Sequence, residues 1–262
     1  MITHRQRARP APWRVRKQSA ARRWLVPFTA MEWSLEWLAY ALSNWTLLEV
    51  LEYLGSFSVL VAVIFYFAES GDRVKQRHYQ AWQVINTAQG KGGSGGRIEA
   101  LQELNADHVS LTGVDVGGAF LRGIQLEHAH LERCDMHAAD LRTGDLRFAR
   151  LSDSNLQSAN LRQTDLTGVD LQSAELQDVD LNAANLTKAD LAYADLSRVD
   201  LRFADVSGIS WKDIQTMKLA NVYGMKNASA EFLDFATKHG AVSLASDDDW
   251  NVLLRQASSD QK

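Results

Sequence analysis

The chain has 262 residues with a formal net charge of −4, a single cysteine and 46% hydrophobic residues. The length allows two structural units, and the lone Cys134 excludes an intramolecular disulfide. The net charge conceals an asymmetry, because residues 1–23 carry eight basic and no acidic residues whereas residues 107–206 carry nine basic and seventeen acidic ones. These two regions are therefore expected to contact different partners.

Residues 1–23 form a basic N-terminal arm. Such an arm suits the anionic headgroups of a membrane. Binding to nucleic acid is the alternative, and a mitochondrial transit peptide would share the arginine-rich, acid-poor composition. The basic residues are Arg5, Arg7, Arg9, Arg14, Arg16, Lys17, Arg22 and Arg23.

Residues 24–45 predict an amphipathic helix that lies in the headgroup region of a membrane, although re-entrant insertion stays open. Glu32, Glu36 and Ser43 share one helical face, while most of the tryptophans fall on the other. Tryptophan is enriched at membrane–water interfaces. The predicted membrane-interface residues are Trp24, Trp33, Trp37 and Trp45.

Residues 47–68 predict a membrane-spanning helix. The last sixteen of them, Tyr53 to Ala68, contain no charged side chain. As a helix, the full segment would be about 33 Å long, which suffices to cross a hydrocarbon core of about 30 Å. A buried helix of a globular domain is the alternative, but no other domain of suitable size is apparent.

Three short segments follow. Residues 72–89 predict an amphipathic juxtamembrane helix with Val74, Ala81, Ile85 and Ala88 on one stripe. Residues 90–96, GKGGSGG, lack the pattern of a phosphate-binding loop and predict a flexible linker. Residues 97–106 predict an N-terminal cap, whose helix would cover the edge of the following domain.

From residue 107 to 209 the sequence repeats every five residues. The central position, from 111 to 206, is leucine in seventeen of twenty repeats, and the position two residues earlier is alanine in ten and valine in five. A period of five scatters the leucines around a helix and onto both faces of a flat strand, so a corner must fall inside every repeat. Aspartate or asparagine precedes the central residue in fourteen repeats, as expected for turns.

Stretches such as AANLT, KADLA and YADLS resemble the pentapeptide repeat family. The resemblance implies a mainly β fold, a right-handed square β-helix with four repeats in each coil. Twenty repeats then make five coils, with Leu111, Leu131, Leu151, Leu171 and Leu191 in one inward ladder. Cys134 occupies an inward position and is predicted to be a core residue.

Beyond the repeats, residues 210–245 predict a C-terminal cap. It comprises a short helix at 211–218, one further repeat around Asn221 that is out of register with the first twenty, and a second helix at 230–239 between Ser229 and Gly240. Residues 246–262 are predicted to be a flexible tail. The corresponding end dimerises in some members of the family, so a homodimer is left open.

The sequence contains no recognisable catalytic set, and neither a cofactor nor a metal is expected. His108, His128, His130 and His137 would fall on different sides of a square coil and are predicted to be solvated. Wrapping the chain at twenty residues per coil stacks four arginines and one asparagine on one face. These predicted partner-binding residues are Arg122, Arg142, Arg162 and Arg202, interrupted by Asn182.

Two interpretations of the arginine row stay open. Each arginine can simply neutralise a neighbouring aspartate, such as Asp140 beside Arg142, or the row can bind an acidic protein or lipid headgroups. We therefore expect a non-enzymatic, membrane-tethered scaffold at a bacterial inner membrane. The eight basic residues before a single span would place the β-helix outside, whereas a second crossing by residues 24–45 and the basic residues after the span favour a cytoplasmic β-helix. The alternative, also implied by the resemblance, is an acidic DNA mimic that modulates or protects DNA gyrase.

Overall fold

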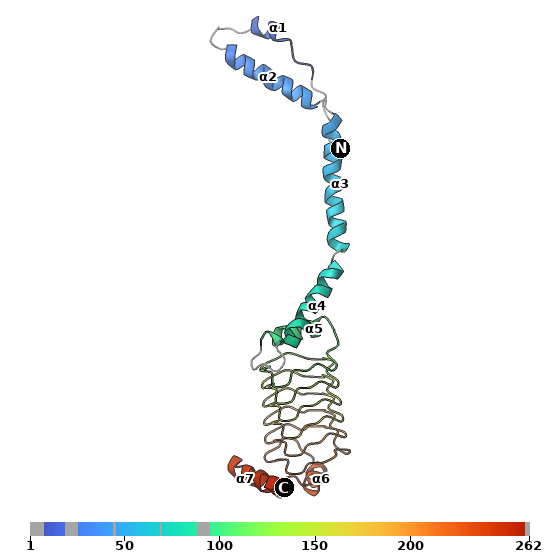
Figure 1. Ribbon diagram of the computed structural model, residues 1–262, viewed down its shortest axis with the longest axis vertical. Coiled ribbons are helices and arrows are strands. Elements are labelled where there is room, and N and C mark those ends of the chain that lie inside the picture. Colours follow the sequence, from blue (N-terminus) through green and yellow to red (C-terminus); the bar gives the residue numbers. More distant parts are fainter. Residues whose placement is uncertain (1–7, 19–25, 44–45, 69, 88–94, 260–262) are drawn as a thin grey trace. The chain divides into compact units, whose positions relative to one another are not determined.

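The computed structural model describes residues 8–18, 26–43, 46–68, 70–87 and 95–259 (Figure 1). The chain divides into two compact units, Met1–Arg73 and Val74–Lys262. The first unit is helical, with α1 at Trp13–Gln18, α2 at Val26–Ser43 and α3 at Thr46–Ala68. The second contains the repeats.

The segment predicted to span a membrane forms a single helix, α3. Among the described residues, however, no helix combines the length and the apolar character that a bilayer crossing requires. The predicted span at 47–68 is therefore not supported by the structure.

Each five-residue repeat of the second unit makes one β-turn. The amide of Val114 donates to the carbonyl of Leu111 at 3.0 Å, and the third turn residue, Gly113, has a φ of 73°. The residue before each central position pairs in parallel with its equivalent one coil away, as Asp115 does with Asp135. One coil therefore takes twenty residues, as the sequence predicted. Because two residues in five form a turn, the chain makes single bridges on each side, and no longer strand is present in the described part.

The aspartates and asparagines before the central position hold the turns. All fourteen of them accept a hydrogen bond from the backbone amide two residues later, at 2.8–3.2 Å. This geometry is that of an Asx turn. The regular spacing of carboxylates is thus architectural, because each one satisfies a local amide that faces the corner.

The core is a narrow column of stacked side chains. The five leucines of the predicted inward ladder are each at most 1% exposed. Cys134 lies in the same column, and burial raises the pKa of its thiol to about 12. Polar residues at inward positions are satisfied locally, since the Thr164 hydroxyl donates to the carbonyl of Leu141 at 2.9 Å. The core therefore accepts small polar side chains only where a backbone carbonyl is within reach.

Two helices cover the N-terminal end of the column. Helix α5, Arg97–Ala106, buries Leu101 and Leu104, and α4, Ser70–Thr87, buries Ala81 and Ile85 in the same core. His78 on α4 lies 2.7 Å from Asp107, and this hydrogen bond lowers the pKa of Asp107. The apolar stripe of α4 was predicted to be juxtamembrane. Two residues of that stripe, Ala81 and Ile85, pack into the core of the repeat domain, whereas Val74 is exposed and Ala88 lies outside the described residues. The juxtamembrane placement of the helix stays a prediction.

The C-terminal end departs from the sequence predictions in two places. The helix predicted at 211–218 is absent from this described segment, and the coil continues with one inserted residue, since Asp190 pairs with Ser210 but Asp195 pairs with Thr216. Ile214 and Met217 point inward. The three-residue spacing of Ile214 and Met217 is compatible with a helix and also with two consecutive corners of the coil. The coil is favoured because the preceding coil offers hydrogen-bond acceptors, such as the Ala194 carbonyl, which accepts from the Gln215 amide.

Two further helices close this end. Helix α6, Ala230–Lys238, begins at Ser229, whose hydroxyl accepts from the Phe232 amide at 3.1 Å. Helix α7, Asp247–Ser259, replaces the predicted flexible tail. It is held by Trp250, whose indole nitrogen donates to the Leu219 carbonyl at 3.0 Å. Helix α7 is fixed because Trp250 and Asp247 find partners on the last complete coils.

The register of the repeats predicts opposite outcomes for two substitutions only two residues apart. Leu161→Asp should abolish the cooperative thermal transition, because Leu161 is fully buried and a carboxylate there has neither water nor a counterion. Gln163→Asp should change stability by less than about 1 kcal/mol, since this outward turn residue has a φ of 57°, a conformation that aspartate tolerates. Circular-dichroism melts of both variants check the register, and similar melts would contradict it.

Candidate functional site

The predicted arginine row lies along one side of the rod. Parallel bridges from Phe120 to Asp140 and from Asp180 to Asp200 place the residues that follow them on the same side of successive coils. Three of the four arginines, Arg122, Arg142 and Arg162, are outward, with Arg122 and Arg162 exposed and Arg142 half-buried. The structure therefore brings these three together as a row, as the repeat length predicted.

The outward arginines are partly engaged by the aspartates of the same side. Arg142 grips Asp140 with two hydrogen bonds, from Nε at 2.8 Å and from Nη2 at 2.6 Å, and these bonds lower the pKa of Asp140. Arg162 reaches the next coil, where it contacts Asp180 at 3.3 Å and the Asn182 oxygen at 3.2 Å. Burial raises the pKa of Asp180 despite this contact. Arg142 and Arg162 therefore do pair with neighbouring aspartates, as the first of the two interpretations of the row expects.

Arg202 is not part of the exposed row. Its side chain is 8% exposed and binds Asp200 through two hydrogen bonds, at 2.9 and 2.7 Å. It also pairs with Asp247 at the start of α7 and lies 5.5 Å from the ring centre of Trp250. Arg202 therefore joins the last coils to α7, which the sequence could not reveal because α7 was predicted to be mobile.

The predicted membrane-interface tryptophans divide into two groups. Trp24 and Trp45 lie outside the residues whose side chains the structure describes. Trp33 and Trp37 lie on α2, where the Trp33 indole donates to the Ala11 carbonyl at 2.8 Å and its ring lies 5.6 Å from that of Trp13. These two tryptophans are half-buried against the segment around α1.

The four repeat-domain histidines do not converge. His128 stacks on Phe148 with ring centres 5.1 Å apart, and His137 lies 2.7 Å from Asp135. No group of three potential metal-binding side chains occurs among the described residues. His128 and His137 thus contact neighbouring side chains on the surface of the coil.

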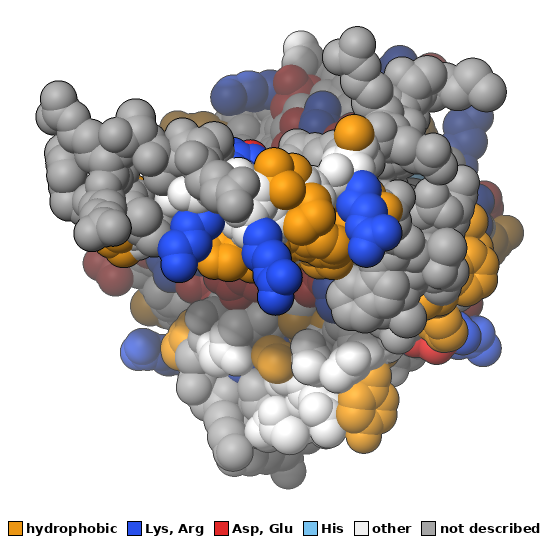
Figure 2. Space-filling model, turned by 90° about the horizontal axis from the view of Figure 1, so that it is seen from above, with side chains coloured by type: hydrophobic (Ala, Val, Ile, Leu, Met, Phe, Trp, Pro, Cys, Tyr) orange, Lys and Arg blue, Asp and Glu red, His pale blue; other side chains and the backbone are white. Residues whose placement is uncertain are grey.

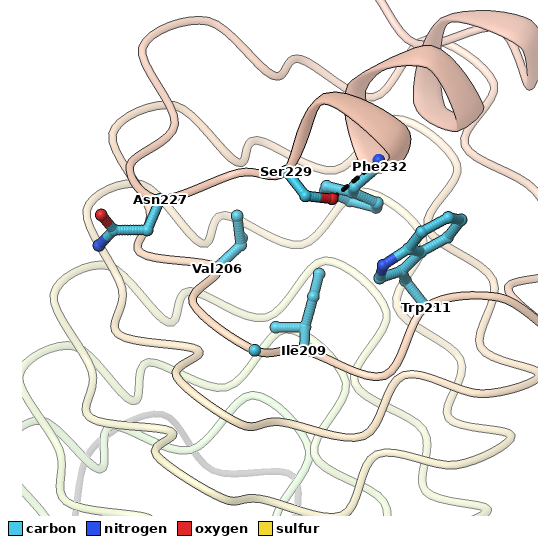
Figure 3. Close-up of a pocket in the computed structure, with 7 residues that line it drawn as sticks. Val206, Ile209, Trp211, Asn227, Ser229 and Phe232 are labelled. Atoms are coloured by element: carbon cyan, nitrogen blue, oxygen red, sulfur yellow. Dashed lines mark hydrogen bonds between the residues drawn. The ribbon is translucent and has the colours of Figure 1, made fainter.

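A pocket of about 200 Å³ opens at the C-terminal end of the rod, and the sequence gave no signal for it. Figure 3 shows Trp211 and Phe232 on one side of it and Val206 and Ile209 on the other. The polar groups at its margin are already used, since Ser229 caps α6 and the Asn227 amide donates to Asp205 at 2.9 Å. The lining of the pocket mixes apolar and polar groups and contains no titratable side chain, so it offers no acid–base pair.

Comparison with known families decides the nature of the rod. A model described as pentapeptide repeats matches residues 110–147, 145–182 and 180–210, with eight copies. Residues 110–210, less than half of the chain, therefore match pentapeptide repeats. Proteins built from pentapeptide repeats are generally non-catalytic structural or interaction proteins, and nothing in the described part of this chain points to an enzyme.

Solved structures similar to the chain include a pentapeptide repeat protein from the thylakoid lumen of Arabidopsis thaliana, with 18% identity, 53% of this chain and 81% of that one covered, and a TM-score of 0.39. Rfr23 from the cyanobacterium Cyanothece 51142 is 30% identical over 38% of this chain and 63% of its own, with a TM-score of 0.26. Full-length QnrB1, a plasmid-mediated fluoroquinolone resistance protein, is 14% identical over 57% and 85%, with a TM-score of 0.30. No curated protein sequence matches the chain.

The position of Arg202 predicts that its loss releases α7 from the pentapeptide repeat domain. Arg202→Gln should cost about 3 kcal/mol, because it leaves the buried Asp200 carboxylate without its cation. Hydrogen exchange in residues 247–259 should rise. Arg198→Gln is the matched control: Arg198 also grips an aspartate, Asp178, through two hydrogen bonds, but this pair is exposed, so its loss should cost less than about 1 kcal/mol. Unchanged exchange in α7 of Arg202→Gln would contradict the assignment.

Proposed function

We propose that the chain is a non-enzymatic scaffold whose pentapeptide repeat domain presents a rigid binding surface and whose helical N-terminal unit attaches it to a membrane. The observation that carries the attachment is the exposure of α3. Eight of the large apolar side chains described on α3 are 45–64% exposed. They are Leu54, Phe57, Val59, Leu60, Val63, Ile64, Phe65 and Tyr66.

These residues lie on all sides of α3 and not on one stripe, since at 100° per residue they are distributed around the whole helix. A helix that is apolar all round belongs in a protein core or in lipid. No described element covers these side chains, and so large an apolar surface is unfavourable in water. Lipid contact along α3 removes this cost.

The residues after α3 fit the edge of a membrane. Arg73 lies 4.5 Å from the ring centre of Tyr66 and donates to the Tyr66 carbonyl at 2.8 Å. Tyrosine and arginine are the side chains that place an apolar body toward lipid and a polar end toward water. Arg73, Lys75 and Arg77 also put positive charge directly after α3, which suits the anionic headgroups at the cytoplasmic face of a bacterial inner membrane.

The partner-binding surface of the rod is the outward arginine row, Arg122, Arg142 and Arg162. Arg142 uses Nε and Nη2 for Asp140, so its Nη1 edge points away from that pair. Planar guanidinium groups on successive coils offer regularly spaced donors for carboxylates. An acidic protein is therefore the favoured partner.

The second candidate function is a DNA mimic that acts on DNA gyrase. It is favoured by another side of the rod, where Asp115, Asp135, Glu175 and Asp195 occupy one column, interrupted by Asn155. The arginine row has the wrong sign for this role. Fragment 74–262, the second compact unit, would inhibit or protect gyrase supercoiling at low stoichiometry if this candidate were correct.

Membrane attachment predicts that the full chain sediments with membranes and resists extraction by carbonate and by high salt. The apolar surface of α3 is held by the hydrophobic effect, which salt does not screen. Fragment 74–262, which lacks α3, should remain in the supernatant. Release of the full chain by carbonate would refute the attachment.

The arginine row predicts salt-dependent capture of an acidic partner. Arg142→Gln with Arg162→Gln should preserve the circular-dichroism melt within about 1 kcal/mol per pair, because the two arginine side chains are 42% and 46% exposed. The double variant should reduce the amount of partner that is crosslinked in pull-downs. Arg133→Gln with Arg198→Gln removes the same charge from other sides of the rod and should not change capture. If both double variants capture the partner equally well, the arginine row does not bind the partner and only forms ion pairs within the rod.

A further inference from the structure

Helix α2 has an apolar stripe that none of the described residues covers. Its members are 40–62% exposed, and their spacing of three and four residues puts them on one face about 80° wide. They are Phe28, Met31, Leu35, Leu38 and Leu42. The stripe lies on the side of α2 opposite Trp33 and Trp37.

The polar side of α2 is already occupied within the same unit. Arg16 of α1 pairs with Glu36 and lies 3.7 Å from Glu32, and Arg9 lies 5.5 Å from the ring centre of Trp37. The two glutamates are the only charged residues of α2. Segment 8–18 thus neutralises the acidic side of α2 and also covers the two tryptophans that the sequence suggested would contact lipid.

We propose that α1 and α2 form a preassembled amphipathic pair, in which the stripe of α2 enters the headgroup–acyl boundary of an anionic leaflet while α1 covers the polar side. This inference rests on the proposed membrane attachment. Segments 8–18 and 26–43 contain four basic and two acidic residues, a net charge of +2. Figure 2 shows Lys and Arg side chains beside hydrophobic ones on the face that it draws. An interfacial element combines one apolar face with a basic polar face.

Two observations favour lipid over a second copy of the chain. The stripe spans only two heptads, and its flanking positions, Pro27, Ser34, Ala39 and Ala41, offer no charges that would fix a partner helix. The remaining flank, Glu32, is taken by Arg16. In addition, α3 begins three residues after α2 ends, so a chain attached through α3 holds the stripe next to the same leaflet.

Depth-dependent fluorescence quenching tests the proposal on the full chain. Cys134→Ala removes the only native cysteine, and alanine is the commonest residue at this repeat position. Single cysteines are then introduced in the stripe (Leu35→Cys or Leu38→Cys), on α1 (Arg14→Cys) and on α3 (Val59→Cys). Each is labelled with an environment-sensitive fluorophore, and the protein is reconstituted in phosphatidylcholine vesicles with or without phosphatidylglycerol that contain lipids brominated in the acyl chain.

We expect brominated lipid to quench the labels at 35, 38 and 59 but not the label at 14. Omitting phosphatidylglycerol should weaken quenching at 35 and 38 and leave quenching at 59 unchanged. The proposal is overturned if 59 is quenched while 35 and 38 are not, or if Leu35→Cys forms a disulfide-linked dimer in the vesicles, since a second copy would then cover the stripe. Absence of quenching at 59 would instead show that membrane attachment itself is wrong, and this proposal with it.

Discussion

Backbone hydrogen bonds between residues one coil apart hold the repeat domain together. Each corner directs an amide and a carbonyl along the rod axis, and the next coil supplies the complement, as when the Leu111 amide donates to the His130 carbonyl at 2.9 Å. Such bonds contribute to stability only where every coil follows the same path. The identical period of the side chains is a consequence, because an inward leucine that slipped by one residue would face water.

The same bonding creates an unsatisfied edge at each end of the rod. Unpaired amides and carbonyls there could recruit other chains. At one end, α5 and α4 bury Leu101 and Ile85 over the first coil. At the other, the buried Asn221 forms two hydrogen bonds with Leu244, and α7 is fixed by Arg202 and Trp250. The caps therefore belong to the folding unit of the repeats, which explains why α4 buries Ala81 and Ile85 in the core of that unit.

On the outer surface of the repeats, the position of a residue within its repeat decides whether it holds a turn or is available for binding. Carboxylates before the central residue hold turns, and side chains after it project outward, where Arg142 and Arg162 stand. The aromatic ring of Phe148 leaves no space for a side chain at Gly168 in the next coil, because a Cβ atom there would lie 2.6 Å from the ring. Gly168 also has a left-handed backbone conformation, so glycine is favoured at this turn for both reasons. Among the described residues, by contrast, most of the exposed large hydrophobic side chains lie on α2 and α3.

The sequence by itself determined the period, the inward residues, the Asx turns and the twenty-residue coil, because these features depend on local geometry repeated many times. It also determined which side Arg122, Arg142 and Arg162 share. Only the tertiary structure decided the fate of Arg202, the order of α7 and the burial of the α4 stripe, because these depend on contacts between segments distant in sequence. It likewise decided which face of α2 is open: a hydrophobic pattern identifies candidate faces, but the packing of α1 onto Trp33 and Glu36 selects which one is left exposed.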